Sequence, residues 1–445
     1  MIRSMTAYAN TESSGPEGVL SCEIRSVNHR YLELGQRLPE ELRPLESALR
    51  ERVAQCPGVT VELQTECLSF EQDADRVGLT VKPAGDEARR IQARWLVACD
   101  GGSSSLRSAL GVRLDDLGFD EPWLVVDVRV NPAGLARLPR VSVQYCEPER
   151  PATLVIGPGQ HRRWEISLKP GEDPQAMATP EQTWRLLARW IGPEHGELWR
   201  QSSYRFHALV AQEWRRGRVF LAGDAAHMQP PFLGQGMCQG IRDAANLAWK
   251  LSAVIKAQVS GAAAERLLDS YGAERQAHVR ELTGRIKQVG AVICERDVER
   301  ARARDAQMLA ACGGVVPDTP RQDMMPPLST GALTAQVVPG CGELFVQPRL
   351  QPDGRLMDDA LGYGWRWVTL GACLPSRLPG AITACLLQGQ NAESQGVVAA
   401  WMQRRSCQAV LVRPDHVVFG TASTPEQADA LIMEWAAWMA PTTSP

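Results

Sequence analysis

The stretch from Val219 to Leu251, VFLAGDAAHMQPPFLGQGMCQGIRDAANLAWKL, constrains the fold more than any other part of the chain. Its small and β-branched residues Val219, Leu221 and Ala222 predict a buried strand, and Gly223 lets the backbone turn at the end of that strand. Asp224 then places an anionic acceptor, suited to a polyol hydroxyl, where open α/β sheets bind ligands. A lone Gly-Asp pair is usually an ordinary capped turn, so the rest of the stretch must support a binding site.

The second half of this stretch predicts a long helix. Pro231, Gly234 and Gln235 delay its start until about Gly236, so the first backbone amides, up to Met237, can face an anion together with the positive end of the helix dipole. We expect one apolar stripe to anchor the helix, formed by Ala244, Leu247, Ala248, Leu251 and Ile255. Trp249 and Lys250 are predicted at the core edge and on the solvated face, respectively.

A second Gly-rich turn lies upstream, in WLVACDGGSSSLR. Trp95 to Ala98 predicts a short apolar strand that delivers Asp100 and Gly101 at its carboxyl end, the ligand-binding end of such sheets. Taken alone, this segment is a Gly/Ser-rich loop, and Arg107 is a surface arginine. Because both turns occur in one chain, a shared ligand site becomes the better interpretation.

The length of 445 residues indicates two or three domains. The segment 1–56 ends at a CPG breaker, and alternating strand-like runs fill 57–121. Antiparallel strand patterns occupy 122–209, and the Val219 stretch with a second long helical pattern covers 210–315. After a Pro-rich linker, strands and helices from 335 to 445 predict a C-terminal domain.

Composition narrows the classes of partner. A net charge of -3 gives no broad basic field, so we expect a small-molecule ligand and neither nucleic acid nor membrane. Twelve cysteines without zinc-ligand spacing or a disulfide framework predict reduced, buried thiols and no metal site. The absence of an export signal or a long apolar run predicts a cytoplasmic protein.

Two single residues are also weighed as candidates for chemistry. For Cys373 a buried structural role is favoured over a redox role, and for His227 packing or hydrogen bonding is favoured over proton transfer.

The motifs WLVACDGGSSSLRSALG and LAGDAAHMQPPFLGQGMCQGIRDAANLAWKL resemble the DG and GD motifs of single-component FAD-dependent aromatic hydroxylases. The 3-(3-hydroxyphenyl)propionate hydroxylase branch is the nearest likeness. LLDSYGAERQAH, GELFVQP and AVLVRPDHVVFGTAS extend the resemblance over about residues 59–422. It implies an α/β fold with an interleaved FAD domain, an inserted antiparallel substrate sheet and a thioredoxin-like C-terminal domain, in a possible homodimer.

The resemblance also implies roles for single residues. Asp224 would bond the ribityl chain of FAD, and the backbone from Gly234 to Met237 would lie at the pyrimidine side of the flavin. Asp100, Gly101 and Arg107 would serve the cofactor and the approach of NADH. The remaining positions of the implied cofactor site are Val219, Leu221, Ala222, Gly223 and Pro231. The implied reaction uses NADH and O2 to hydroxylate a phenolic acid ortho to its hydroxyl, and since the flavin carries this chemistry, no catalytic side chain is assigned.

The chain departs from this family at its start. The family begins with a strand and a G-x-G-x-x-G turn for the ADP half of FAD, and the sequence contains no such motif near its N-terminus. MIRSMTAYAN, EIRSVNHRYLEL and RLPEELRPLESALRERV instead resemble the opening of YicC-like proteins, a family associated with endoribonuclease activity. His29 and Arg30 are best read as a strand-edge pair, and no catalytic role is carried over to them.

We therefore expect a fold that lacks the first βαβ unit. Losing the central strand would expose a sheet edge, and losing the glycine turn would remove the amide cradle for the pyrophosphate. The expected consequence is weak FAD binding or none. A non-catalytic fusion, and less plausibly a YicC-like RNA-acting protein, are the alternatives to an active hydroxylase.

Overall fold

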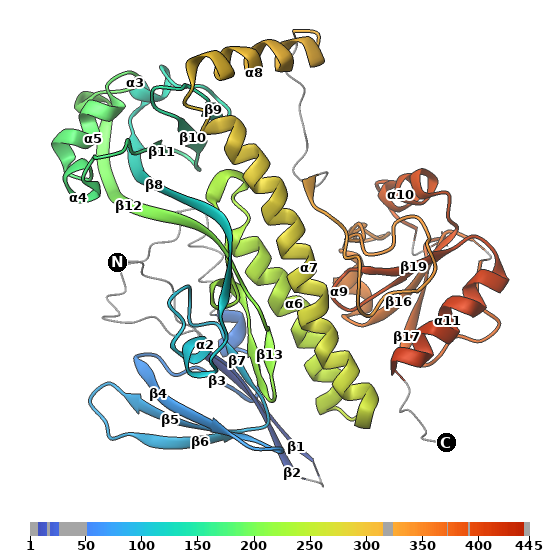
Figure 1. Cartoon of the computed structure of the whole chain (residues 1–445). Coiled ribbons are helices and arrows are strands. Elements are labelled where there is room, and N and C mark those ends of the chain that lie inside the picture. Colours follow the sequence, from blue (N-terminus) through green and yellow to red (C-terminus); the bar gives the residue numbers. More distant parts are fainter. Residues whose placement is uncertain are drawn as a thin grey trace. The chain divides into compact units, whose positions relative to one another are not determined.

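The computed structural model describes residues 8–15, 18–25, 51–314, 324–371, 373–389 and 392–439. The chain divides into two compact units, one made of Met1–Cys238 and Thr283–Arg321 and the other of Gln239–Leu282 and Gln322–Pro445. Two long helices, α6 (Gly236–Ile255) and α7 (Gly261–Ile293), contribute residues to both units (Figure 1). No helix in the described ranges is both long enough and apolar enough to cross a membrane.

The first unit contains a six-stranded sheet that carries both Gly-rich turns. Its order is β13 (Arg215–Arg216), β14 (Val219–Leu221), β7 (Leu96–Ala98), β2 (Gly18–Arg25), β1 (Tyr8–Gly15) and β3 (Val59–Thr60). β7 is parallel to β14 on one side and to β2 on the other. The predicted exposed edge beside β7 is therefore wrong, because the N-terminal segment supplies a strand there. The carboxyl ends of β2, β7 and β14 lie at one edge of the sheet.

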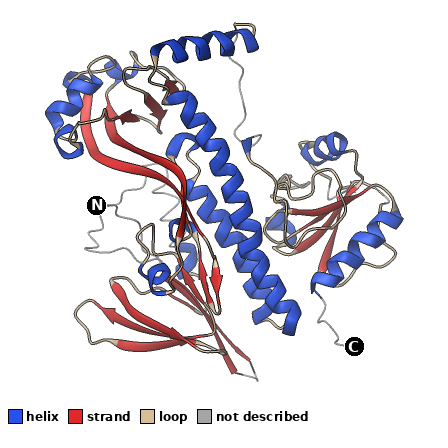
Figure 2. Ribbon diagram, in the orientation of Figure 1, coloured by secondary structure: helices blue, strands red, loops and turns tan. Residues whose placement is uncertain are grey.

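The predicted inserted sheet is confirmed as a six-stranded antiparallel sheet (Figure 2). Its order is β15 (His227–Met228), β12 (Gly196–Ala211), β8 (Leu114–Val130), β11 (His161–Ser167), β10 (Ala152–Ile156) and β9 (Val143–Tyr145). One face packs in an apolar core with residues of the short helices α3 (Pro132–Leu135), α4 (Pro174–Met177) and α5 (Pro180–Leu187). The long strands β8 and β12 extend beyond the predicted range 122–209 at both ends.

The first unit has two further parts. A three-stranded sheet consists of β4 (Thr65–Gln72), β5 (Val77–Pro83) and β6 (Arg89–Ala93), which lie within the strand-like runs predicted over 57–121. Helix α8 (Val298–Ala311) follows α7. The spacing of Leu42, Leu45, Leu49 and Val53 predicts a helix in PEELRPLESALRERV, and this segment lies outside the described residues except for a helical end at 51–54. The pair His29 and Arg30 also lies outside them.

The second unit is built on a four-stranded sheet. Its order is β17 (Ile382–Leu386), β16 (Trp365–Thr369), β18 (Ala409–Val412) and β19 (Val418–Ala422), with β16 parallel to β17 and the other pairs antiparallel. The short helix α9 (Met357–Leu361) precedes β16. Helices α10 (Val397–Arg405) and α11 (Pro425–Met439) contribute to two separate cores, because alternate strand residues face opposite sides of the sheet. The Trp365 ring lies 5.5 Å from the Trp249 ring of α6 and 6.0 Å from that of Trp435.

Helix α6 is anchored differently from the sequence prediction. Leu247 and Leu251 are buried as expected, but Ala244 and Ala248 are exposed, and Lys250 is fully buried. The inward face carries the polar residues Gln239, Asp243, Asn246 and Lys250, at helical spacing. The stripe prediction and the solvated position of Lys250 are wrong because polar partners elsewhere in the chain satisfy this face.

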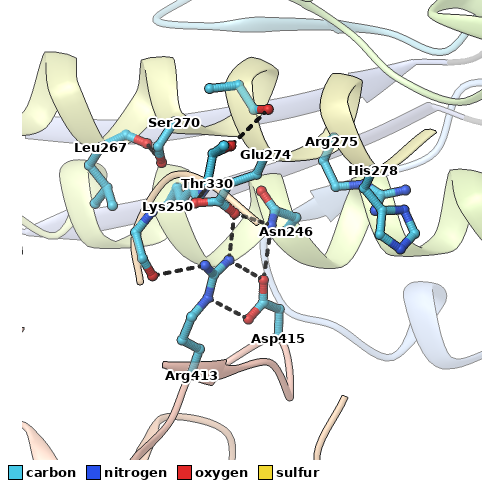
Figure 3. Close-up of polar contacts among 12 residues, drawn as sticks. Asn246, Lys250, Leu267, Ser270, Glu274, Arg275, His278, Thr330, Arg413 and Asp415 are labelled. Carbon is cyan, nitrogen blue, oxygen red and sulfur yellow. Dashed lines mark hydrogen bonds and ion pairs between the residues drawn. The ribbon is translucent and has the colours of Figure 1, made fainter. Parts of the chain in front are cut away.

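Those partners form a buried ion network within the second unit (Figure 3). Lys250 Nζ lies 2.9 Å from Glu274 Oε1, and the Arg413 guanidinium lies 2.8 Å from Glu274 Oε2 and 2.6 Å from Asp415 Oδ2. Asn246 Nδ2 donates to both Glu274 and Asp415. Burial lowers the pKa of Lys250 to about 8. Burial alone would raise the pKa of Glu274, but the Arg413 and Lys250 charges hold it far below its ordinary value.

Candidate active site

The GD turn presents an exposed carboxylate at the end of a buried strand. Val219, Leu221 and Ala222 are each at most 2% exposed, whereas Asp224 is exposed. Gly223 begins a short 3-10 turn, Gly223–Ala225, with φ of +60°, which a residue with a Cβ rarely adopts. The predicted strand and turn are therefore confirmed, and the geometry directs Asp224 away from the core.

The following loop prepares an open helix N-terminus. Pro231–Leu233 forms a 3-10 turn, Gly234 closes it with φ of +61°, and α6 begins at Gly236 as predicted. Nothing lies within 4 Å of the positions that a Cβ would take at Gly234 and Gly236. Gln235 is buried and Met237 is 46% exposed. The backbone of this turn can therefore be approached closely by a ligand.

Phe232 anchors this loop inside the first unit. Its ring contacts the rings of Phe119 and Trp123, each with centroids 5.6 Å apart, and its carbonyl accepts a hydrogen bond from Gln144 Nε2 at 3.2 Å. A Cβ on Gly290 of α7 would lie 2.6 Å from the Phe232 ring. The glycine thus permits the close approach of α7 that packs the loop in place.

The DG turn is held by its own side chains. Asp100 is buried, and its carboxylate accepts hydrogen bonds from Ser104 Oγ at 2.5 Å and from the Leu106 amide at 3.0 Å. Ser104 is the N-cap of the short helix α2 (Ser105–Ala109), and its hydroxyl accepts a hydrogen bond from the Arg107 amide at 2.9 Å. Gly101 has φ of +81° and is also buried. Asp100 thus shapes the turn, while its predicted service to the cofactor stays a prediction.

Arg107 connects the two turns. Its guanidinium donates to the Ala225 carbonyl of the GD turn at 2.9 Å and to the Gly102 carbonyl of the DG turn at 2.8 Å. The side chain is only 7% exposed, so the interpretation as a surface arginine is wrong. Burial lowers the pKa of Arg107, and the nearby Asp100 carboxylate opposes this shift. The two predicted motifs thus lie together, because their strands β7 and β14 are parallel neighbours and Arg107 links the turns that follow them.

Two further candidates have packing roles. His227 is 1% exposed and stacks on the Trp214 ring at 5.3 Å with an interplanar angle of 18°, which confirms the packing interpretation. Cys373 is 3% exposed, and burial raises the pKa of its thiol, which confirms the buried cysteine. The general prediction of buried cysteines is wrong, since eight of the eleven cysteines whose side chains the structure describes are partly exposed.

Sequence reasoning missed a charged cluster on the inserted sheet. Asp127 on β8 accepts hydrogen bonds from Arg163 at 2.7 and 3.2 Å, and His161 Nε2 lies 2.8 Å from its Oδ1. Glu165, two residues beyond Arg163, is 8% exposed. The signal in the sequence was the alternation in HRRWEIS, where His161, Arg163 and Glu165 alternate with the apolar Trp164 and Ile166 along the strand.

The described residues fit the ring half of an FAD site. An exposed carboxylate at the end of β14, the left-handed Gly234 and the open N-terminus of α6 suit a polyol and an anionic ring. The G-x-G-x-x-G turn for the pyrophosphate is absent from the sequence, and residues 26–50, which follow β2, lie outside the described ranges.

Comparison with known families bears directly on this site. The FAD binding domain family matches residues 34–285, which is more than half of the chain and includes both turns. A probable NADH-specific resorcinol 4-hydroxylase of Rhodococcus jostii is 35% identical over 424 residues, covering 90% of this chain and 76% of the relative. The chain belongs to the FAD-dependent aromatic hydroxylases.

Other comparisons agree with this assignment. A 3-(3-hydroxy-phenyl)propionate/3-hydroxycinnamic acid hydroxylase of Burkholderia cenocepacia is 32% identical, covering 84% of this chain and 74% of the relative. The flavin-dependent monooxygenase PieE, solved with FAD and substrate, shares the fold with a TM-score of 0.70 at 20% identity, over 90% of this chain and 79% of PieE. Aklavinone-11 hydroxylase, solved with FAD and aklavinone, has a TM-score of 0.66 at 22% identity, over 90% and 77% of the two chains.

The unusual start of this hydroxylase is also matched. The N-terminal region of endoribonuclease YicC-like proteins matches residues 2–58, which confirms the resemblance of the opening segment. This match overlaps the FAD binding domain over residues 34–58. The flavoprotein match thus begins ahead of residue 59, where the sequence likeness was placed.

Proposed function

We propose that this hydroxylase uses NADH, O2 and FAD to add a hydroxyl group to a phenolic ring, ortho to the existing hydroxyl. The observation that carries the proposal is the pairing of the exposed Asp224 with the open N-terminus of α6 in one strand-turn-helix. Relatives named for NADH-specific resorcinol hydroxylation and for 3-(3-hydroxy-phenyl)propionate hydroxylation support the substrate class. A phenolic acid such as 3-(3-hydroxyphenyl)propionate is the substrate expected from the sequence.

Each part of the site has a physical task. Asp224 would accept hydrogen bonds from ribityl hydroxyls, and the Gly234 to Met237 amides would stabilise negative charge at the pyrimidine side of the ring. When bound, the flavin supplies hydride acceptance and oxygen activation. Arg107 fixes the separation of the two turns, so that both would meet the same cofactor. The buried Asp100 supports α2 beneath this arrangement.

The N-terminal segment determines how tightly we expect FAD to be bound. β2 occupies the strand position beside β7, but the residues after it do not contain the G-x-G-x-x-G sequence whose turn would bind a pyrophosphate. We infer that FAD is bound through its ribityl and ring half and is retained weakly. The mixed sheet with α10 and α11 supports a thioredoxin-like C-terminal domain. A homodimer and a cytoplasmic location are further predictions, to be tested by light scattering and by cell fractionation.

The test is NADH consumption by the purified chain with added FAD. We expect phenol-stimulated oxidation of NADH and a product with one more ring hydroxyl, identified by mass spectrometry, with either 3-(3-hydroxyphenyl)propionate or resorcinol. A folded chain that neither binds FAD nor oxidises NADH with any phenol would contradict the proposal and support the alternative of a non-catalytic fusion.

A further inference from the structure

The groups that fit the ring and the ribityl chain of a flavin lie in one continuous stretch of the chain. Asp224 is exposed just after β14, and the left-handed Gly234 leads into the open N-terminus of α6 at Gly236. A carboxylate suits ribityl hydroxyls, and backbone amides at the start of a helix suit the negative charge of a reduced ring. These contacts therefore do not depend on the N-terminal segment.

The adenylate half of FAD needs a different structure, at the end of a neighbouring strand. Dinucleotide-binding sheets hold the pyrophosphate with the amides of a glycine-rich turn that leads directly from a strand into a helix. β2 lies beside β7 and ends at Arg25, but residues 26–57 contain a single glycine, Gly35. The helix predicted in PEELRPLESALRERV begins near Pro39, well beyond the end of β2. The match to the FAD binding domain family also begins beyond β2, at residue 34.

Charge does not replace the missing amides. Residues 26–58 contain five arginines and five glutamates, so this segment carries no net positive charge. A pyrophosphate is usually bound where backbone amides or a surplus of basic side chains offset its negative charge. The N-terminal segment therefore supplies neither of the two usual partners of a pyrophosphate.

The DG turn, at the end of the neighbouring strand β7, already uses its hydrogen-bond donors. The Leu106 amide donates to Asp100 at 3.0 Å, and the Arg107 amide donates to Ser104 Oγ at 2.9 Å. The Arg107 guanidinium donates to the carbonyls of both turns, at 2.9 and 2.8 Å. A phosphate placed here would compete with these bonds and would be repelled by the Asp100 carboxylate. The DG turn therefore does not substitute for a glycine-rich turn.

We propose that this site binds flavins through the ring and the ribityl chain alone, so that it accepts FMN and riboflavin about as tightly as FAD. The inference rests on the proposed function, because it concerns the same GD turn and the same helix. The adenylate of FAD gains no amide donors or basic partners, so it adds no affinity. The ligand class of the site is the riboflavin core, whichever group the ribityl chain carries at its end.

The test is equilibrium dialysis of the full chain against FAD, FMN and riboflavin in turn, with bound flavin measured by its visible absorbance. We expect the three dissociation constants to agree within about threefold. ADP in large excess should not lower the binding of FAD. A dissociation constant for FAD more than about tenfold below that for riboflavin would overturn the inference, as would competition between ADP and FAD.

Two carboxylate variants show which groups bind all three flavins. Asp224→Ala should weaken the binding of FAD, FMN and riboflavin by the same factor, at least about tenfold, because it removes a charged acceptor of ribityl hydroxyls. The matched control is Glu213→Ala, which removes an exposed carboxylate that pairs with Arg216 at 2.5 Å ahead of β14. We expect it to leave all three dissociation constants unchanged. A loss in Asp224→Ala that differs strongly between FAD and riboflavin would contradict a shared mode of binding.

Failure of this inference is distinguishable from failure of the proposed function. Tight binding of FAD with weak binding of riboflavin would overturn the inference and leave the hydroxylase proposal intact. A folded chain that binds none of the three flavins would contradict the proposed function itself.

Discussion

Replacing Arg413 by methionine tests the buried ion network most severely. The guanidinium lies fully buried and donates to Asp415 at 3.0 and 2.6 Å, to Glu274 at 2.8 Å and to the Ala332 carbonyl at 3.0 Å. Its removal takes away the ion pair of Asp415 and leaves Glu274 paired with Lys250. Breaking a buried ion pair from one side costs about 3–5 kcal/mol. Since about 1 kcal/mol shifts the melting temperature of a unit this size by roughly 2–4 °C, we expect a fall of roughly 6–20 °C.

Urea unfolding of the full chain, followed by circular dichroism and tryptophan fluorescence, measures this loss. Trp249 is a local reporter because the Arg413 guanidinium lies 5.2 Å from the centre of its ring. The control Arg405→Met breaks a pair with Glu343 in which both side chains are about one-third exposed, 32% and 30%. That variant should lose less than about 1 kcal/mol. A loss of the same small size for Arg413→Met would refute the claim that the network links α6 and α7 to the segment that follows β18.

Three further changes probe other parts of the account. Arg107→Lys keeps the charge, but a lysine cannot donate to the carbonyls of both turns. The dissociation constant of FAD should therefore rise about tenfold in a fluorescence titration, equivalent to about 1.4 kcal/mol. An unchanged dissociation constant would contradict the role of Arg107 in linking the two turns. Gly290→Ala places a Cβ 2.6 Å from the Phe232 ring and should cost about 1–3 kcal/mol in thermal unfolding. The same change at Gly284, where nothing lies within 4 Å, should be neutral or slightly stabilising, and equal effects at both sites would be inconsistent with this packing. Because burial raises the pKa of Glu165 to about 7 in the folded chain, the folded state binds this proton more tightly than the unfolded state. The stabilisation is fully present below about pH 4.5 and is lost as the pH rises to about 7, with a total on the order of 3 kcal/mol. Glu165→Gln should remove this part of the pH dependence, and an identical stability profile for variant and wild type would refute it.

The strand-turn-helix at the candidate site was predictable because its signals are local. A β-branched strand, a glycine that permits positive φ and a helix start after Pro231 and Gly234 depend only on neighbouring residues. The strand at Val219 and the helix start at Gly236 were both found where expected. The exposure of Asp224 follows from its place at the end of a buried strand.

The errors arose where distant residues decide the outcome. Lys250 was placed in solvent because helical periodicity cannot reveal that Glu274 compensates its charge. The edge of β7 was expected to be open because the N-terminal sequence lacks the family motif, yet β2 pairs with it through backbone groups, which need no motif. The partnership of Arg107 with the Ala225 carbonyl spans 118 residues and left no local signal.

The central claim is that this hydroxylase holds FAD through its GD turn, and an FAD titration tests it most directly. Quenching of flavin fluorescence should saturate with the wild type, while the bound FAD should be lost on gel filtration because the glycine cradle is absent. Asp224→Ala should weaken the binding at least about tenfold, which is the loss expected for the hydrogen bonds of one charged acceptor. Equal affinity of the variant and the wild type, or no saturable quenching by the wild type, would contradict the account.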